Sequence, residues 1–147
     1  MPSLIRVLAE REVPARPERV FAFLTDYQDA RPLILTENYL DYRVEEGGSG
    51  AGTVVSYRLQ AAGRERAYRL RAETPAHNTL VERDTASSLV TTWRVMPAPN
   101  DRSIVRLVTE WQGSGGIRGF FERTFAPRGL RRIYDEVLER LDAALSR

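Results

Sequence analysis

The sequence contains no cysteine and no lysine, and these absences exclude several kinds of chemistry. Without cysteine the chain forms no disulfide, offers no thiolate nucleophile and builds no cysteine-ligated zinc site. Without lysine it forms no Schiff base with a carbonyl substrate. All 22 basic residues are therefore arginine, which we interpret as the coding bias of a GC-rich, bacterial genome rather than as chemistry.

Histidine is nearly absent as well. The single histidine, His77, lies in the segment Thr74-Pro75-Ala76-His77-Asn78, whose composition predicts an exposed turn. A Ser-His-Asp triad would need this histidine inside a cavity, so we do not expect one. No group of His, Asp and Glu has the spacing of metal ligands. The sequence therefore predicts no metal and no cofactor.

Long apolar runs are also missing. No stretch of about 18 apolar residues predicts a transmembrane helix, and the N-terminus lacks the apolar core of a signal peptide, so the simplest expectation is a cytoplasmic protein. Acidic residues and arginines alternate along the chain, and the net charge is only +2. Because no basic stripe is visible, we do not expect a nucleic-acid partner. A length of 147 residues predicts one domain, 1–147.

What is present is a regular order of strand and helix patterns. A half-buried strand is predicted over 5–13, with Arg11 as an exception on its apolar face. A helix begins near Pro17, because proline suits a first helical turn, and a short helix or turn follows it. Alternating apolar rows predict six more strands in consecutive hairpins, at 40–44, 53–59, 68–72, 79–84, 89–95 and 105–111.

Two further segments complete the pattern. The segment 117–145 is predicted to be helical with one broad apolar face, and Pro127 and Gly129 are expected to bend or restart this helix. The glycine-rich loop 47–52 predicts a flexible hairpin connection. It does not suit a phosphate, because a strand rather than a helix follows it and lysine is absent.

Four segments carry a family resemblance: 13–26, the hairpin Gly50-Ala51-Gly52-Thr53, the strand end Thr109-Glu110-Trp111-Gln112-Gly113, and 117–145. Together they resemble the START-like, or SRPBCC, superfamily of polyketide cyclases, dehydratases and lipid carriers. The resemblance implies an α+β helix-grip fold, in which a curved antiparallel sheet of about seven strands wraps around a long C-terminal helix. It also implies a cavity between sheet and helix. The catalytic residues stay unknown, because members of the superfamily do not share them.

Inward-facing aromatic and hydroxyl side chains are the candidates for lining this cavity. Such side chains hold a flat or acyl ligand by apolar contact and stacking. The predicted ligand-binding residues are Tyr57, Tyr68, Thr91, Trp93, Thr109, Trp111, Phe121, Phe125 and Tyr134. The alternative for each is ordinary core packing. Tyr57 and Tyr68 are the best candidates for polar contacts, because a buried hydroxyl needs a partner.

The strand 79–84 carries charges whose facing the pattern leaves open. One alternation directs Arg83 inward, as a possible polar group of the cavity, and the other directs Glu82 and Asp84 inward. An inward charge is costly unless it is paired. It would therefore indicate a ligand carboxylate, a ligand carbonyl or an acid/base role. The alternative is an edge strand with solvated charges.

A second charged group lies at the start of the C-terminal helix. Arg128, Arg131 and Arg132 could meet a phosphate, an anionic lipid surface or RNA. Acidic residues follow within helical reach, at Asp135, Glu136 and Glu139. We expect these acids to pair with the arginines and to form a solvated, salt-bridged face.

Three functions are compatible with these observations. The first is a carrier or sensor that binds a hydrophobic small molecule, such as a lipid, polyketide, quinone or aromatic compound, with entry gated by 27–38 and the glycine loop. The second is a cyclase or dehydratase in which Tyr57, Tyr68 and one charged residue polarise a carbonyl or move a proton. The third is a protein- or ribosome-interaction module. The chain is expected to be a monomer or a homodimer.

Overall fold

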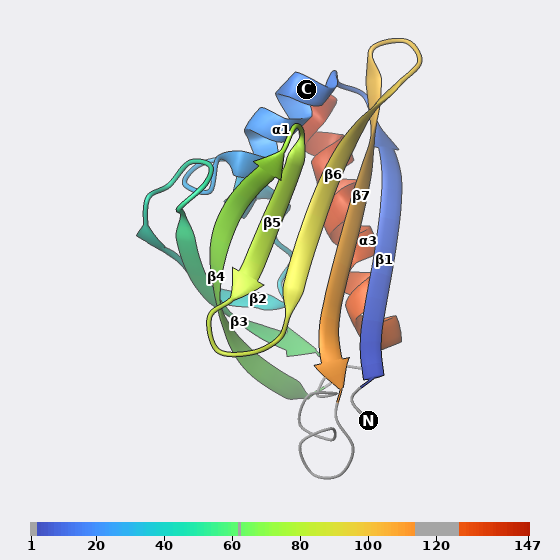
Figure 1. Cartoon of the computed structure of the whole chain (residues 1–147). Coiled ribbons are helices and arrows are strands. Elements are labelled where there is room, and N and C mark those ends of the chain that lie inside the picture. Colours follow the sequence, from blue (N-terminus) through green and yellow to red (C-terminus); the bar gives the residue numbers. More distant parts are fainter. Residues whose placement is uncertain (1–2, 62, 114–126) are drawn as a thin grey trace.

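The computed structural model describes residues 3–61, 63–113 and 127–147 (Figure 1). The elements, in chain order, are β1 (Ser3–Val13), α1 (Pro17–Thr25), the 3₁₀ helix η1 (Arg31–Ile34), β2 (Tyr39–Glu46), β3 (Val54–Ala61), β4 (Arg64–Ala76), β5 (Thr79–Asp84), β6 (Val90–Ala98), β7 (Arg102–Gly113) and α3 (Pro127–Leu145). None of the described helices is long and apolar enough to span a membrane.

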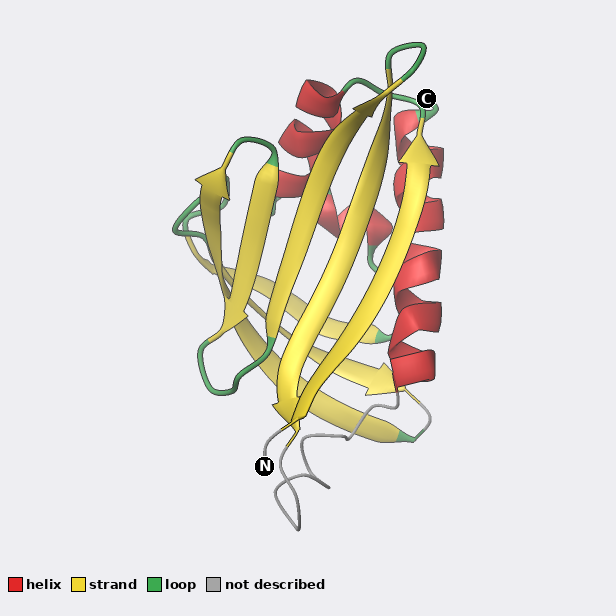
Figure 2. Cartoon of the chain, turned by 45° about the vertical axis from the view of Figure 1, so that its right-hand side comes forward, coloured by secondary structure: helices red, strands yellow, loops and turns green. Residues whose placement is uncertain are grey.

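The seven strands form one antiparallel sheet in the order β1-β7-β6-β5-β4-β3-β2. Strands β2 to β7 are consecutive hairpin neighbours, whereas β1 joins at the far edge beside β7. Figures 1 and 2 show the sheet curving around α3, with α1 at one end of the helix. The helix-grip fold implied by the resemblance is confirmed.

The core lies between the curved sheet and α3. One face of α3 is buried, and its buried residues are Leu130, Ile133, Tyr134, Val137, Leu138, Leu141 and Leu145. This face packs against β1 and η1, and inward residues of β1 such as Val7 and Val13 are almost fully buried. The i, i+3, i+4 spacing of the helix and the period of two in the strand place these apolar faces opposite each other.

Arg11, the one charged residue on the apolar face of β1, has a structural explanation. Arg11 lies on the inward face of the strand, and its Nε donates to the Asp142 carboxylate of α3 at 2.9 Å. The ion pair is partly exposed, with side-chain exposures of 41% for Arg11 and 26% for Asp142. Arg11 therefore joins the edge strand to the helix without burying an unpaired charge.

The predicted strands are all present, although several extend a few residues further than the alternating rows. Helix α1 begins at Pro17 as predicted, and its Val20 and Leu24 are buried. The short helix after it is η1. Of the long helix predicted over 117–145, the described part begins at Pro127, and 117–126 lie outside the described residues.

The glycine-rich loop between β2 and β3 is tied to the turn after α1. The backbone N–H of Tyr27 donates to Gly48 O at 3.0 Å, and Gly50 N donates to Thr25 O at 2.9 Å. The loop follows a sharp path, with Gly47 at φ 70°, where a Cβ atom would lie 3.1 Å from Thr53 Cα. The loop therefore holds the segment that follows α1 in this structure, and its role as a gate stays a prediction.

Candidate functional site

A small cavity lies between the sheet and α3. Its volume is about 30 Å³, which is room for about two water molecules. Tyrosine and tryptophan rings form much of the wall, together with apolar residues such as Ile34, Leu35 and Val137. Charged and hydroxyl groups interrupt this apolar wall at two places, which we call the charged pole and the hydroxyl pole. Each pole comes from segments that are far apart in the sequence.

The charged pole is centred on Glu82 of β5, which is 2% exposed. Its carboxylate accepts hydrogen bonds from Tyr27 Oη at 2.5 Å, from Arg31 Nη1 at 2.9 Å and from Trp93 Nε1 at 2.8 Å. Both carboxylate oxygens are therefore occupied. Three donors, one of them the Arg31 guanidinium, surround this buried carboxylate, so Glu82 is built to organise its neighbours.

Sheet register explains why Glu82 faces inward. Glu82 pairs with Thr91 of β6, and Thr91 pairs with Thr109 of β7, so all three lie in one inward row across the sheet. Arg83 consequently faces outward, where its half-exposed side chain pairs with Glu73 at 3.2 Å. The expectation of Arg83 as a polar cavity group is thus wrong, because β5 adopts the other alternation.

Arg31 is held over the cavity by more than its ion pair. Its Nη1 also donates to Leu24 O at 3.0 Å, and its guanidinium lies 4.9 Å from the ring centroids of both Tyr27 and Trp93. Nε is buried and has no hydrogen-bond partner. Nη2 makes no hydrogen bond to a described residue either. The guanidinium is therefore fixed in place, with donor capacity left over at the cavity wall.

Burial and charge keep this cluster protonated. Burial alone would lower the pKa of Arg31, but the adjacent Glu82 carboxylate raises it above its ordinary value. Burial and the same carboxylate raise the pKa of Tyr27 far above its ordinary value. Both groups thus stay in their hydrogen-bond-donating forms throughout the physiological pH range.

The hydroxyl pole joins β6, β7 and α3. Thr91 Oγ1 and Thr109 Oγ1 are 2.7 Å apart, and Thr109 Oγ1 lies 2.6 Å from Tyr134 Oη. All three residues are buried. Burial raises the pKa of Tyr134 to about 12, so the chain of hydroxyls is neutral, and each hydroxyl is able to donate or to accept.

Tyrosine rings connect the two poles. The rings of Tyr39 and Tyr57 meet edge to face with centroids 5.0 Å apart, and both residues line the cavity. Burial raises the pKa of both hydroxyls well above the ordinary value. Neither hydroxyl makes a hydrogen bond within the described part of the chain. Tyr42 also lines the cavity, and its hydroxyl donates to Tyr27 O at 2.7 Å.

Comparison with known proteins places this geometry in a family. Residues 5–146 match the model of the family described as polyketide cyclase / dehydrase and lipid transport. The chain belongs to this family. It is a START-like protein, consistent with the seven-stranded curved sheet and C-terminal helix. A search of curated protein sequences found no match.

Solved structures of this START-like fold extend the comparison. The NMR structure of the KanY protein (ms6282) is similar at 44% identity and a TM-score of 0.88, over 99% of both chains. The Zhui aromatase/cyclase from Streptomyces sp. R1128 has 21% identity and a TM-score of 0.63, over 97% of this chain and 88% of that one. A START superfamily protein from Mycobacterium smegmatis has 13% identity and a TM-score of 0.63, over 95% and 93%. The last two likenesses show the fold alone.

The structure brings four of the predicted ligand-binding residues to the wall of this START-like cavity: Tyr57, Thr91, Trp93 and Tyr134. Thr109 lies behind them in the hydroxyl pole. Tyr68 packs against Tyr57 with ring centroids 5.7 Å apart and does not line the cavity.

The remaining predicted residues lie elsewhere. Trp111 is buried, with an unpartnered Nε1, and is not part of the cavity wall. Phe121 and Phe125 lie outside the described residues. Sequence reasoning did not name Tyr27, Arg31, Tyr39 and Tyr42 as site residues, although all four contribute to the site. Tyr27 had a signal, because it continues the i, i+3, i+4, i+7 apolar spacing of Val20, Phe23 and Leu24. Arg31 had none, because Arg31-Pro32 reads as a helix break.

His77, the only histidine in the sequence, is exposed in the β4–β5 turn and does not line this cavity. Its ring nitrogen Nε2 lies 3.1 Å from Asn78 Nδ2. Within the described ranges, no group of three or more His, Asp or Glu residues is placed to hold a metal ion.

Proposed function

We propose that this protein binds a small, neutral and largely apolar molecule in the cavity, as a carrier or sensor. Family and fold support a hydrophobic-ligand or cyclase-type role. The observation that carries the finer proposal is Arg31, whose charge is already balanced by Glu82 while Nε lacks a partner. A guanidinium in this state suits a ligand oxygen that accepts a hydrogen bond, such as a carbonyl, phenol or ether.

The balance of charge disfavours an anionic ligand. Arg31 and Glu82 are 10% and 3% exposed in their side chains, and together they are neutral. A ligand carboxylate at Arg31 would place a second negative charge beside Glu82 inside the core, where charges interact strongly and are poorly solvated. Fatty acids therefore fit the site less well than neutral molecules of the same shape.

Ligand entry requires the wall to move. A cavity of about 30 Å³ is much smaller than the roughly 300–1,000 Å³ of ordinary ligand pockets. The segment from η1 to β2 contributes Ile34 and Leu35 to the wall, and Arg140 of α3 holds it through a 2.9 Å hydrogen bond to Leu35 O. We infer that this segment opens to admit the ligand.

Native mass spectrometry of freshly purified protein, followed by denaturing extraction, tests the proposal. The expected result is a stoichiometric neutral adduct. Tyr57→Phe removes a wall hydroxyl and is expected to weaken binding about five- to ten-fold, the effect of one hydrogen bond. Tyr68→Phe is the matched control, because Tyr68 packs behind Tyr57. Protein that carries no adduct and takes up no apolar fluorescent probe would contradict the proposal.

A second candidate function is a cyclase-type enzyme acting on a polyketide-like substrate. It is favoured by the Tyr39 and Tyr57 hydroxyls, which line the cavity with high pKa values and could donate to a developing oxyanion. Glu82 is poorly suited to act as a base, because three donors occupy it. An enzyme would lose turnover on Tyr57→Phe while it still bound substrate, whereas a carrier would show the binding loss alone.

A further inference from the structure

Three exposed arginines cluster at the start of α3. Arg128, Arg131 and Arg132 form no ion pair with a described residue, although nine other arginines do. The predicted pairing with the acids that follow does not form, since Glu136 pairs with Arg140 at 3.3 Å instead. The salt-bridged face expected from the sequence is therefore absent here, and three positive charges face solvent.

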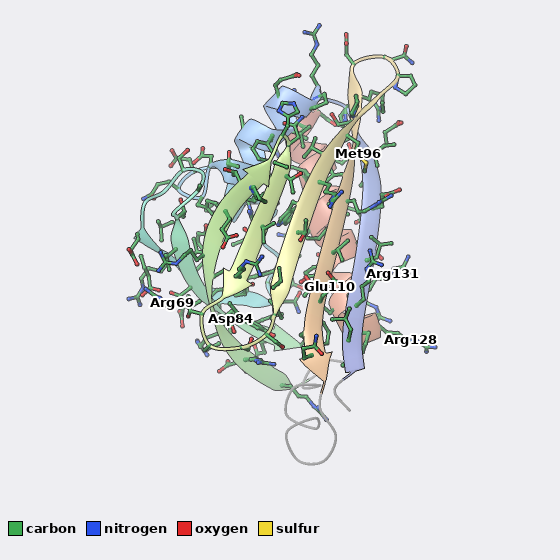
Figure 3. All side chains as sticks on the ribbon, viewed as in Figure 1. Arg69, Asp84, Met96, Glu110, Arg128 and Arg131 are labelled. Atoms are coloured by element: carbon green, nitrogen blue, oxygen red, sulfur yellow. The ribbon has the colours of Figure 1, made fainter. Side chains whose placement is uncertain are left out.

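The geometry of α3 places two of these arginines beside β1. Arg131 precedes Asp142 by 11 residues and Arg128 precedes it by 14, so at about 100° per residue they lie within about 20° and 40° of Asp142 around the helix axis. Asp142 contacts Arg11 of β1. The same side of the helix therefore faces the edge of β1, and Figure 3 shows Arg128 and Arg131 beside this strand.

The position along β1 follows from the rise of each element. Arg131 lies about 16 Å from Asp142 along the helix, which equals about five strand residues. Because Asp142 is level with Arg11, Arg131 is level with Arg6. The helix and strand contacts thus bring Arg131 and Arg128 next to the first half of β1.

This half of β1 exposes apolar side chains. Leu4 and Leu8 are 57% and 42% exposed on the outer face, and exposed Arg6 lies between them. The neighbouring acids in the described structure include Asp135 and Glu139 on α3, Glu10 on β1, which pairs with Arg106, and Glu110, which is opposite Arg6 on β7 (Figure 3). Arg132 lies on the exposed side of α3, about 80° from Asp142 around the helix axis. We call the surface formed by Leu4, Arg6, Leu8, Arg128, Arg131 and Arg132 the β1–α3 patch. It combines four positive charges with two exposed leucines.

We propose that the β1–α3 patch docks the protein on an anionic lipid bilayer. Arginines attract the negative surface of such a bilayer, and leucines enter the boundary between headgroups and acyl chains. A nucleic acid would use the arginines but would gain nothing from two exposed leucines. A bilayer is also a medium from which an apolar ligand can be taken up, although the docking itself does not depend on the cavity.

Vesicle co-sedimentation tests the proposal with the full chain. Binding is expected to vesicles of phosphatidylcholine mixed with phosphatidylglycerol, to weaken with salt, and to be weak with phosphatidylcholine alone. The variant Arg128→Gln/Arg131→Gln/Arg132→Gln should bind the anionic vesicles about a hundred-fold more weakly. The control Arg43→Gln/Arg71→Gln/Arg94→Gln removes three exposed arginines elsewhere on the sheet and changes the net charge equally, so it should retain most of the binding.

Several results would overturn the proposal. One is no binding to anionic vesicles, and another is an equal loss in the two triple variants, which would indicate a general effect of net charge. A dimer in native mass spectrometry that Leu4→Ser/Leu8→Ser dissociates would assign the patch to a second copy of the chain. Binding of single-stranded RNA in the absence of vesicle binding would assign it to nucleic acid. Uptake of an apolar probe from solution should be unchanged in the patch variant, so failure of docking and failure of the cavity proposal are separable.

Discussion

At the scale of single residues, the most consequential feature is a buried carboxylate that supports its neighbours. Glu82 fixes Arg31, Tyr27 and Trp93 by one hydrogen bond each. Removing a buried charge from such a cluster leaves the opposite charge unpaired in the core, which is far more costly than losing an exposed ion pair. Glu82 therefore stabilises the fold and prepares the site at the same time.

Glu82→Gln should be strongly destabilising for this reason. The amide keeps the shape but leaves the Arg31 charge without its counter-ion, and we expect a loss of about 3–5 kcal/mol in the free energy of unfolding. Glu73→Gln is the matched control, because Glu73 pairs with Arg83 on the surface, and it should cost less than about 1 kcal/mol. Urea denaturation measures both. Similar losses in the two variants would show that Glu82 is not an organising group.

The hydroxyl pole gives a pH prediction. The pKa of Tyr134 is raised to about 12, whereas a tyrosine in the unfolded chain titrates near 10. Above about pH 10 the unfolded chain loses the proton while the folded chain keeps it, so stability falls as pH rises. The contribution of Tyr134 to folding stability is fully present below about pH 10 and is lost as the pH rises from there to about 12. Tyr134→Phe should make this alkaline decline shallower, by up to about 1.4 kcal/mol per pH unit, in unfolding curves collected from pH 9 to 11. An unchanged slope would contradict the assignment.

At the scale of elements, periodicity predicted most of the fold and little of the charged pole. Strand rows with a period of two and the apolar stripe of α3 are local patterns, and the structure follows them. The Arg31–Glu82 pair joins residues 51 positions apart, and it forms because β5 takes the alternation that sends Glu82 inward. Both alternations of this strand place charged residues inward, so the pattern of apolar residues does not distinguish them.

The hydroxyl pole was partly predictable, because the apolar pattern does fix which way its threonines face. Thr91 and Thr109 belong to clear apolar rows, and an inward threonine needs a hydroxyl partner. Their pairing with each other follows from the β6–β7 register, which the hairpin between these strands sets. Tyr134 joins them because it lies on the buried face of α3.

Arg140 is the element-scale contact whose loss should open the cavity. It joins α3 to the η1–β2 segment through Leu35 O and, at 3.7 Å, through Glu37. Arg140→Met keeps much of the side-chain volume but removes the charge-assisted hydrogen bond, which is worth about 1.5–3 kcal/mol. We expect an apolar fluorescent probe to enter at least about ten-fold faster in stopped-flow mixing. Arg132→Met, on the exposed side of the same helix, should leave the rate unchanged. Equal rates in all three proteins would place the entrance elsewhere.

At the scale of the whole molecule, the curved sheet and α3 enclose a polar but electrically balanced site. The cavity has a neutral ion pair at one pole, neutral hydroxyls at the other, and aromatic rings between them. Such a site should discriminate ligands by charge more than by detailed shape. The fold supplies the enclosed volume, and the pairing of Glu82 with Arg31 supplies the discrimination.

A pair of ligands that differ only in charge tests this property directly. A naphthyl methyl ketone and the corresponding naphthoic acid have similar shapes, but the acid is ionised at pH 7. The ketone should raise the thermal midpoint of unfolding, since a ligand at about 100 times its Kd adds about 2.7 kcal/mol, and the acid at the same concentration should not. Preferential stabilisation by the acid would mean that Arg31 acts as a free positive charge despite Glu82. If neither compound shifts the midpoint while Arg140→Met gains a response to the ketone, closure of the η1–β2 segment, rather than the chemistry of the poles, limits binding.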